Sequence, residues 1–406
     1  MDAIFSGIKV LDFTSNLAGP GSTAILADFG AEVIKIERPV DGDDIRSIAP
    51  RLDGQAIFHL FSNRGKKSVT VDLADPRGAD IIKKMIETTD VLVESYKPDH
   101  MAKFGLDYET LSAINPRLVY VSISACGQTG GYKTKPGFDI IAQAMSGIMD
   151  LTGDRSGTPT RIGTTVSDYV ASLNAALSVA SALFYRERSG VGQHVDISLL
   201  DGMVAINSMI EQAATLSTHP TRTGNHYPNM APYGIYCGNN GESCIIAAYT
   251  NKAWTKFCET IGRPDLETDP LTATNVDRVK NIDYLVSNIE PWLKSFESID
   301  EPLAIMEKAG IACCKIFTTD DVVTDKVLWE RGTLVEVETP PSFTEHRTAK
   351  VRGPWIKMSK TPAVTGRAPD LGEDNIFYLS QLGMTENEII ALENEWTEKA
   401  LAKKKK

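Results

Sequence analysis

Apolar and polar residues alternate along the first third of the chain in a pattern that predicts strands separated by helices. The apolar runs that predict strands occupy residues 9–13, 32–37, 68–72, 90–94 and 118–123. Helical periodicity lies between them, for example from the Ala18-Gly-Pro-Gly-Ser22 turn through Phe29. Strands at this spacing, with helices between them, are typical of βαβ units and a parallel sheet. Sheets of that kind bind ligands at the carboxyl ends of their strands.

The pattern becomes helical in the middle of the chain and changes again after residue 216. Helices are predicted over residues 138–149, 169–188 and 199–216, with a short strand at 195–197. A polar stretch rich in His, Pro and Asn follows, and then a hairpin within residues 234–249. Helices at about 252–261, 278–296 and 300–309 complete a smaller α+β region. Extended segments and a last helix near 386–400 end the chain.

These changes predict the domain organisation. Residues 1–216 form the first part of a large domain, and residues 217–232 form a linker or lid loop. Residues 233–333 form a small α+β domain, and residues 334–406 form a C-terminal segment. The predicted fold class is α/β, with a Rossmann-like parallel sheet in the large domain.

Composition excludes several classes of function but adds little about the fold. The chain has 406 residues and a formal net charge of −11, which argues against general affinity for nucleic acid or anionic membranes. A small anionic ligand held by a few Arg and Lys residues remains compatible with that charge. No apolar run approaches membrane-spanning length, and the first residues lack the basic region of a signal peptide, so we expect a cytoplasmic protein.

Cysteine and histidine usage argue against disulfide and metal chemistry. The six cysteines contain no CxxC pair, so we expect free and mostly buried thiols. The six histidines contain no pair at metal-ligand spacing, and no metal is expected. The closing lysines, residues 403–406, are interpreted as a solvated tail.

Asp168 is the first candidate for chemistry, because it stands where a Gly/Thr-rich loop meets a long helical segment. Ser167 or Asp168 is the natural start signal of that helix. Free N–H groups and the positive end of the helix dipole should then favour the ionised carboxylate and keep it a ready nucleophile. An ordinary helix-capping aspartate would satisfy the same local pattern.

Two further features could contact an anionic ligand. The loop Asn16-Leu-Ala-Gly-Pro-Gly-Ser22 follows the first strand and opens a helix, so its N–H groups can cradle a phosphate or a carbonyl oxygen. Arg38 follows the second strand, where α/β sheets present residues to a ribose or its phosphate. A structural turn and a solvated charge are the alternative interpretations.

Taken together, the sequence resembles the class III CoA-transferases, the family that includes formyl-CoA:oxalate and carnitine CoA-transferases. The likeness covers nearly the whole chain and rests on the order and spacing of modest motifs. These include Val10-Leu-Asp-Phe13, Gly30-Ala-Glu-Val-Ile-Lys-Ile-Glu37, Pro136-Gly-Phe-Asp-Ile-Ile-Ala-Gln143, Gly163 to Asp168, Gly190-Val-Gly-Gln-His-Val-Asp196 and Arg367-Ala-Pro-Asp-Leu-Gly372.

The resemblance implies a nucleophilic role for Asp168 and a substrate role for coenzyme A. Asp168 attacks an acyl-CoA to give an aspartyl–acyl anhydride, and CoA thiolate then forms an aspartyl-CoA thioester that an acceptor carboxylate cleaves. Because the thioester energy is conserved, neither ATP nor a metal is required. The acceptor is expected to be a short carboxylate or dicarboxylate such as oxalate, from the likeness of residues 41–46, 53–55 and 230–233 to members of that type.

The resemblance also implies the binding residues and the assembly. Asn16 could assist at the acyl oxygen, because Leu17 replaces a glutamine of the oxalate enzyme. His226 and Asn229, in a lid near residues 224–231, would bind a substrate carboxylate. Relatives form interlocked homodimers in which the C-terminal segment returns to the large domain. The expected contacts to CoA are Asn16, Leu17, Ala18, Arg38, Val71, Asp72, Leu73, Ala74, Ser95, Tyr96, Lys97, Lys103, Pro136, Gly137, Phe138 and Asp139.

Two other functions fit parts of this pattern, and Cys126 has two interpretations. An α-methylacyl-CoA racemase would share the CoA site but needs a histidine where this chain has Phe138, so it would lack one of its two bases. A non-catalytic acyl-CoA-binding protein would not depend on Asp168 at all. Cys126 replaces an aromatic residue of relatives and is either a reactive thiol near the site or a buried spectator.

Overall fold

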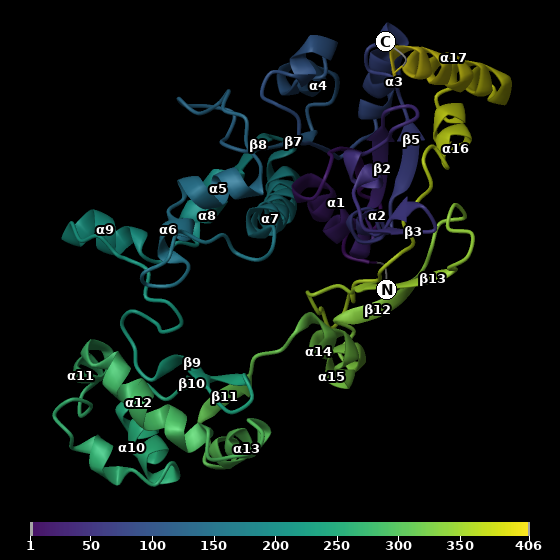
Figure 1. Ribbon diagram of the computed structural model, residues 1–406. Helices are drawn as coiled ribbons and strands as arrows, with labels where there is room; N and C mark the ends of the chain where they lie inside the picture. Colours follow the sequence, from purple (N-terminus) through teal and green to yellow (C-terminus); the bar gives the residue numbers. More distant parts are fainter. Residues whose placement is uncertain (1–2, 405–406) are drawn as a thin grey trace. The chain divides into compact units, whose positions relative to one another are not determined.

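The computed structural model describes residues 3–404 (Figure 1). The described chain forms two compact units. Unit 1 contains the residues up to Ile148, Ile162–Ile210 and the part from Lys326 onward. Unit 2 contains Met149–Arg161 and Glu211–Asp325. The stretch 217–232, interpreted from sequence as a linker, therefore belongs to the second unit together with a short excursion before α7.

A six-stranded parallel sheet is the centre of unit 1, which confirms the predicted α/β class. The central strand pairs Leu11 with Ile34 on one side and with Leu92 on the other. The strands, in spatial order, are β5 (Lys67–Thr70), β2 (Glu32–Glu37), β1 (Lys9–Phe13), β6 (Val91–Glu94), β7 (Val119–Ser124) and β8 (His194–Ser198).

Helices cover both faces of this sheet. Successive strand residues point to opposite sides, so each face has its own apolar core. Leu11 packs into a core with α3, α4, α16 and α17, whereas its neighbour Val10 packs into a core with α1, α7 and α8. The helices of unit 1 are α1 (Ala18–Asp28), α2 (Ile57–Ser62), α3 (Pro76–Ile86), α4 (Tyr108–Ile114), α5 (Asp139–Met145), α7 (Val166–Ser189), α8 (Leu199–Ala205), α15 (Lys326–Glu330), α16 (Asn375–Ser380) and α17 (Glu386–Lys404).

Short elements complete unit 1. Two antiparallel hairpins are formed by β3 (Arg51–Leu52) with β4 (Gln55–Ala56), and by β12 (Leu334–Glu338) with β13 (Thr348–Arg352). Two 3₁₀ turns, η1 (Asp44–Ser47) and η2 (Met101–Phe104), follow the carboxyl ends of β2 and β6 along the chain.

Unit 2 is a small α+β fold with its own core. Buried Trp254, Phe257 and Leu285 pack against the three-stranded antiparallel sheet. Its elements are β9 (Tyr233–Cys237), β10 (Ser243–Ala247), β11 (Ala312–Lys315), α10 (Asn251–Thr260), η3 (Pro264–Glu267), α11 (Asn275–Lys280), α12 (Ile282–Leu293), α13 (Asp300–Lys308) and α14 (Thr319–Thr324). The predicted hairpin is confirmed, with Cys244 opposite Tyr236.

Several predicted helices have different limits in the structure. A break at Ser146-Gly147 divides residues 138–149 into α5 and α6 (Ile148–Leu151). A turn at residues 206–209 divides residues 199–216 into α8 and α9 (Ile210–Leu216). The last helix was predicted to end near Ala400 but continues to Lys404. All six cysteines are free, as predicted, but Cys237 and Cys314 are exposed. None of the described helices combines the length and apolar character needed to cross a membrane.

Candidate active site

A cavity of about 850 Å³ opens at the carboxyl ends of the parallel strands in unit 1. Strand β2 delivers Arg38 to it, β5 delivers Val71, and β6 delivers Ser95. This is the edge at which open α/β sheets bind ligands. Residues of the expected CoA contact set that line the cavity are Asn16, Arg38, Val71, Asp72, Leu73, Ala74, Ser95, Tyr96, Lys97, Pro136, Gly137 and Phe138.

Four residues of that expected set do not line the cavity. Leu17 and Ala18 lie at the start of α1, where Ala18 is buried and its carbonyl accepts a hydrogen bond from Ser172. Lys103 is exposed on η2. Asp139 begins α5 and points its carboxylate toward the start of α7 instead.

The cavity also has charged lining residues that sequence reasoning did not assign. Lys133 and Lys135 come from the loop after β7, and Lys403 and Lys404 come from the last turn of α17. Acidic lining residues accompany them, and Asp44 forms an ion pair with Arg38. The run of charges near residue 41 and the lysine-rich end were visible in the sequence, but nothing local indicated that they meet.

A buried charge network supports the loop between β1 and α1. The Lys35 ammonium donates to the Thr14 carbonyl oxygen at 2.8 Å and lies 2.9 Å from an Asp43 carboxylate oxygen. The other oxygen of Asp43 accepts the Asn16 N–H at 2.9 Å. Burial opposes ionisation of Asp43, but Lys35 and these N–H donors lower the pKa of Asp43 to about 2. Asn16, which has a left-handed φ of 69°, is thereby fixed at the cavity wall.

A second pair extends this network beneath the loop. Lys66 lies 2.8 Å from an Asp12 carboxylate oxygen and also donates to the carbonyl of Pro20 and to the side chain of Asn63. Burial lowers the pKa of Lys66 to about 7. Burial would raise the pKa of Asp12, but Lys35 and Lys66 hold it well below its usual range. The fold thus keeps these charges paired in the interior.

The start of α7 differs from the sequence prediction. The helix begins at Val166, its capping residue Thr165 makes no side-chain cap, and Ser167 and Asp168 both lie in the first turn. The cap comes from another helix, because an Asp139 carboxylate oxygen accepts the Ser167 N–H and its hydroxyl, both at 2.9 Å. The other oxygen of Asp139 accepts the Gln143 amide at 2.7 Å.

This arrangement reverses the expected electrostatics of Asp168. The sequence predicted that the helix start would favour the ionised carboxylate. In the structure, burial first and the nearby Asp139 carboxylate second raise the pKa of Asp168 to about 7. Removal from water and a like charge both disfavour the anion, and they outweigh the helix dipole. One turn later, Ser172 bonds the Asp168 and Ala18 carbonyls and so connects α7 to α1.

The proposed substrate-binding residues His226 and Asn229 lie in unit 2. The His226 ring packs edge-on against Tyr236, and its Nδ1 is buried without a hydrogen-bond partner in the described chain. Burial lowers the pKa of His226, so the ring is neutral near pH 7. The Asn229 carbonyl accepts a hydrogen bond from Asn275.

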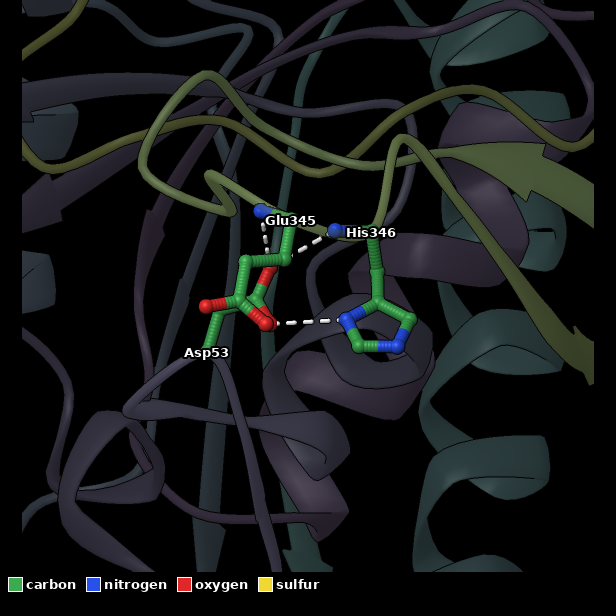
Figure 2. A group of neighbouring side chains, drawn as sticks. All are labelled: Asp53, Glu345 and His346. Carbon is green, nitrogen blue, oxygen red and sulfur yellow. Dashed lines mark hydrogen bonds and ion pairs between the residues drawn. The ribbon is translucent and has the colours of Figure 1, made fainter.

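Cys126 lies at the cavity, whereas a cluster of potential metal ligands lies in another part of unit 1. Cys126 lines the cavity, and burial raises the pKa of its thiol, which disfavours the reactive thiolate. Asp53, Glu345 and His346 lie together in unit 1 (Figure 2). The Asp53 carboxylate accepts the N–H groups of Glu345 and His346 at 2.8 Å and contacts His346 Nδ1 at 2.7 Å. These bonds tie the β12–β13 connection to the β3–β4 turn.

Comparison with known proteins agrees with this geometry. A family model described as CoA-transferase family III matches residues 5–375. The chain is 35% identical over 390 residues to a succinyl-CoA–D-citramalate CoA-transferase of Chloroflexus aurantiacus, which covers 95% of this chain and 96% of that protein. It is 40% identical over 310 residues to an acetyl-CoA:oxalate CoA-transferase of Acetobacter aceti, with coverage of 76% and 79%.

A solved structure shows the same fold. The crystal structure of a CAIB/BAIF family protein from Brucella suis matches with a TM-score of 0.82 and 33% sequence identity. The match covers 94% of this chain and 100% of that chain.

Proposed function

The chain belongs to CoA-transferase family III and is a CoA-transferase, and we propose that it moves CoA from an acyl-CoA to a short carboxylate or dicarboxylate through Asp168. One observation carries the role of Asp168. It is a half-buried carboxylate in the first turn of α7, and that turn is held by Asp139, which directly follows the cavity-lining Gly137 and Phe138.

The proposed reaction has four acyl-transfer steps that balance without a cofactor. A carboxylate oxygen of Asp168 attacks the thioester carbonyl, the C–S bond breaks, and CoA departs as the thiolate. A mixed anhydride between Asp168 and the donor acyl group remains. The thiolate attacks the aspartyl carbonyl and releases the donor acid, which forms an aspartyl-CoA thioester. The acceptor carboxylate attacks that carbonyl and releases thiolate with a second anhydride. The thiolate then takes the acceptor acyl group and regenerates the Asp168 carboxylate.

The cavity supports the assignment of CoA as the shared substrate. Its wall combines apolar residues such as Val71 and Leu73 with cations such as Arg38 and Lys97. An adenine ring and a pantetheine arm suit the apolar surface, and phosphates suit the cations. Asn16, which comes just before α1, lines the cavity and would face developing negative charge on an acyl oxygen.

The relatives support the proposed substrate class. The two relatives described above are named for citramalate and for oxalate, both of which carry two carboxylates. We extend that class to this chain, with His226 and Asn229 as proposed contacts to the carboxylate that does not react. A racemase is disfavoured because Phe138, in the position of the second base, is a 71% exposed apolar ring that cannot transfer a proton.

Trapping the acyl-enzyme tests the proposal directly. Hydroxylamine added during turnover of succinyl-CoA with oxalate should convert Asp168 to a hydroxamate that peptide mass spectrometry detects. Asp168→Asn should lower kcat by roughly a thousandfold or more, because no carboxylate remains to form the anhydride. Transfer at an undiminished rate in that variant would overturn the assignment, and solvent exchange of a substrate α-proton would favour the racemase.

A further inference from the structure

The last turn of α17 forms part of the cavity wall. Ala400, Lys403 and Lys404 line the same cavity as Arg38 and Lys97. The sequence predicted a helix ending near Ala400, followed by solvated lysines. Residues 405–406 lie outside the described chain, but Lys403 and Lys404 are helical and belong to the site.

Contacts to α3 fix where this helix ends. Trp396 is 1% exposed, and its indole N–H donates to an Asp75 carboxylate oxygen at 3.1 Å. Lys399 donates to the same oxygen at 3.2 Å. Asp75 caps α3 and directly follows Ala74, which lines the cavity. Figure 1 shows α17 beside α3, so the lysines reach the cavity from an anchored helix.

Two half-exposed ion pairs lie at this end of the cavity. Lys404 forms an ion pair with Asp41, and Arg38 forms one with Asp44. All four residues line the cavity, and each of these side chains is about half exposed. Ion pairs at such exposure contribute little free energy, so a dianionic phosphate can displace the carboxylates. Lysines in a last helical turn also complement the negative end of the helix dipole.

We propose that Lys403 and Lys404 bind the phosphates of the 3′-phospho-ADP portion of CoA, together with Arg38. The identity of this ligand rests on the proposed function above. An element more than 300 residues from Arg38 in the chain thereby closes the phosphate end of the cavity, and the Asp41 contact holds Lys404 in place until the ligand arrives.

Calorimetric titration with CoA tests this claim. The double variant Lys403→Gln/Lys404→Gln should bind CoA about tenfold more weakly at low salt, because charge-assisted bonds to phosphate are lost. The loss should shrink at high salt, where exposed charges are screened. The matched control is Lys280→Gln/Lys308→Gln, which removes two exposed lysines from the last turns of α11 and α13 in unit 2. It should bind CoA like the wild type.

Dephospho-CoA locates the contact. A smaller loss with this ligand assigns the lysines to the 3′-phosphate, and an equal loss assigns them to the pyrophosphate. CoA affinity within twofold of wild type in the double variant would overturn the inference while leaving Asp168 chemistry untouched. If the wild-type protein itself binds neither CoA nor acyl-CoA, the proposed function fails, which is a separate result.

Discussion

Asp168 combines two requirements that oppose each other. Its carboxylate must be ionised to attack a thioester, yet it must lie where water cannot hydrolyse the anhydride. Burial and the Asp139 carboxylate raise its pKa to about 7, so the anion is made more basic at the cost of being less populated at low pH. Asp139 is therefore a positioning residue, because it acts through the start of α7 and through its charge.

The pH dependence of transfer should follow from this pKa. We expect kcat/KM to rise with pH through a midpoint near 7 and to level off above about pH 8, as Asp168 becomes ionised. Asp139→Asn keeps an oxygen for the Ser167 N–H but removes the like charge, so the midpoint should move to lower pH. Initial rates measured from pH 5 to 9 provide the comparison.

Glu94 provides the control for this profile. It is buried beside the cavity-lining Ser95, and burial raises the pKa of Glu94 to about 7 as well. Glu94→Gln should leave the midpoint unchanged if Asp168 is the titrating group. A midpoint that disappears in Glu94→Gln, or that does not move in Asp139→Asn, would assign the profile to another residue.

The same pKa has a consequence for folding. An acid whose pKa is raised in the folded state destabilises the protein above that pKa, and the penalty disappears as pH falls below the unfolded value near 4. Asp168→Asn should therefore stabilise the protein at pH 8 by about 1–2 kcal/mol, allowing for partial exposure, and by much less at pH 4.5. Thermal unfolding at both pH values measures this, and an equal change at both would refute the electrostatic explanation.

At the scale of elements, the β1–α1 loop depends on a partner from elsewhere in the chain. Asp43 accepts N–H groups from Asn16 and Ile45 and neutralises buried Lys35. Asn16 has a left-handed φ of 69°, and its N–H finds its acceptor in the Asp43 carboxylate, which lies outside the loop. The position of the cavity wall therefore depends on a buried ion pair.

Removing that partner should damage stability and activity together. Asp43→Ala leaves the Lys35 charge under-compensated in the interior and should lower the free energy of unfolding by about 2–4 kcal/mol. Asp44→Ala, its half-exposed neighbour, should change it by less than about 1 kcal/mol. Urea unfolding gives both values. Similar losses for the two variants would show that the buried pair does not support the loop.

At the scale of the molecule, the exposed surface of α7 is unusually apolar for a helix in water. Leu177 is 67% exposed and Phe184 is 61% exposed, and Leu173 and Tyr185 on the same helix are also exposed. A patch of this kind on a single chain indicates a protein–protein interface. It supports the proposed homodimer, in which a second copy would cover α7.

An interlocked dimer should not exchange subunits. When two dimers carrying different affinity tags are mixed, native mass spectrometry should detect no mixed dimer over hours, since exchange requires unfolding. Mixed dimers should form after both proteins are unfolded in urea and refolded together. Rapid mixing without denaturant would contradict interlocking, and a monomer in light scattering would contradict the homodimer itself.

Local patterns predicted the parallel sheet and several of the helices that cover it. The runs at β1, β2 and β6 are apolar on both faces because helices cover both sides of a parallel sheet, and that burial is encoded residue by residue. The breaks within the predicted helices at residues 138–149 and 199–216 were missed, because periodicity alone does not register where a glycine or a loop contact ends a turn.

The sequence by itself determined the parallel sheet, the presence of Asp168 at a helix start, and the positions of Arg38 and Asn16 after successive strands. Only the tertiary structure raised the pKa of Asp168, because burial first and the Asp139 carboxylate from a different helix second disfavour its anion. It also brought Lys403 and Lys404 to the cavity. The physical reason is that periodicity and capping act over a few residues of chain, whereas burial and Coulomb interactions depend on distance in space, which packing alone fixes.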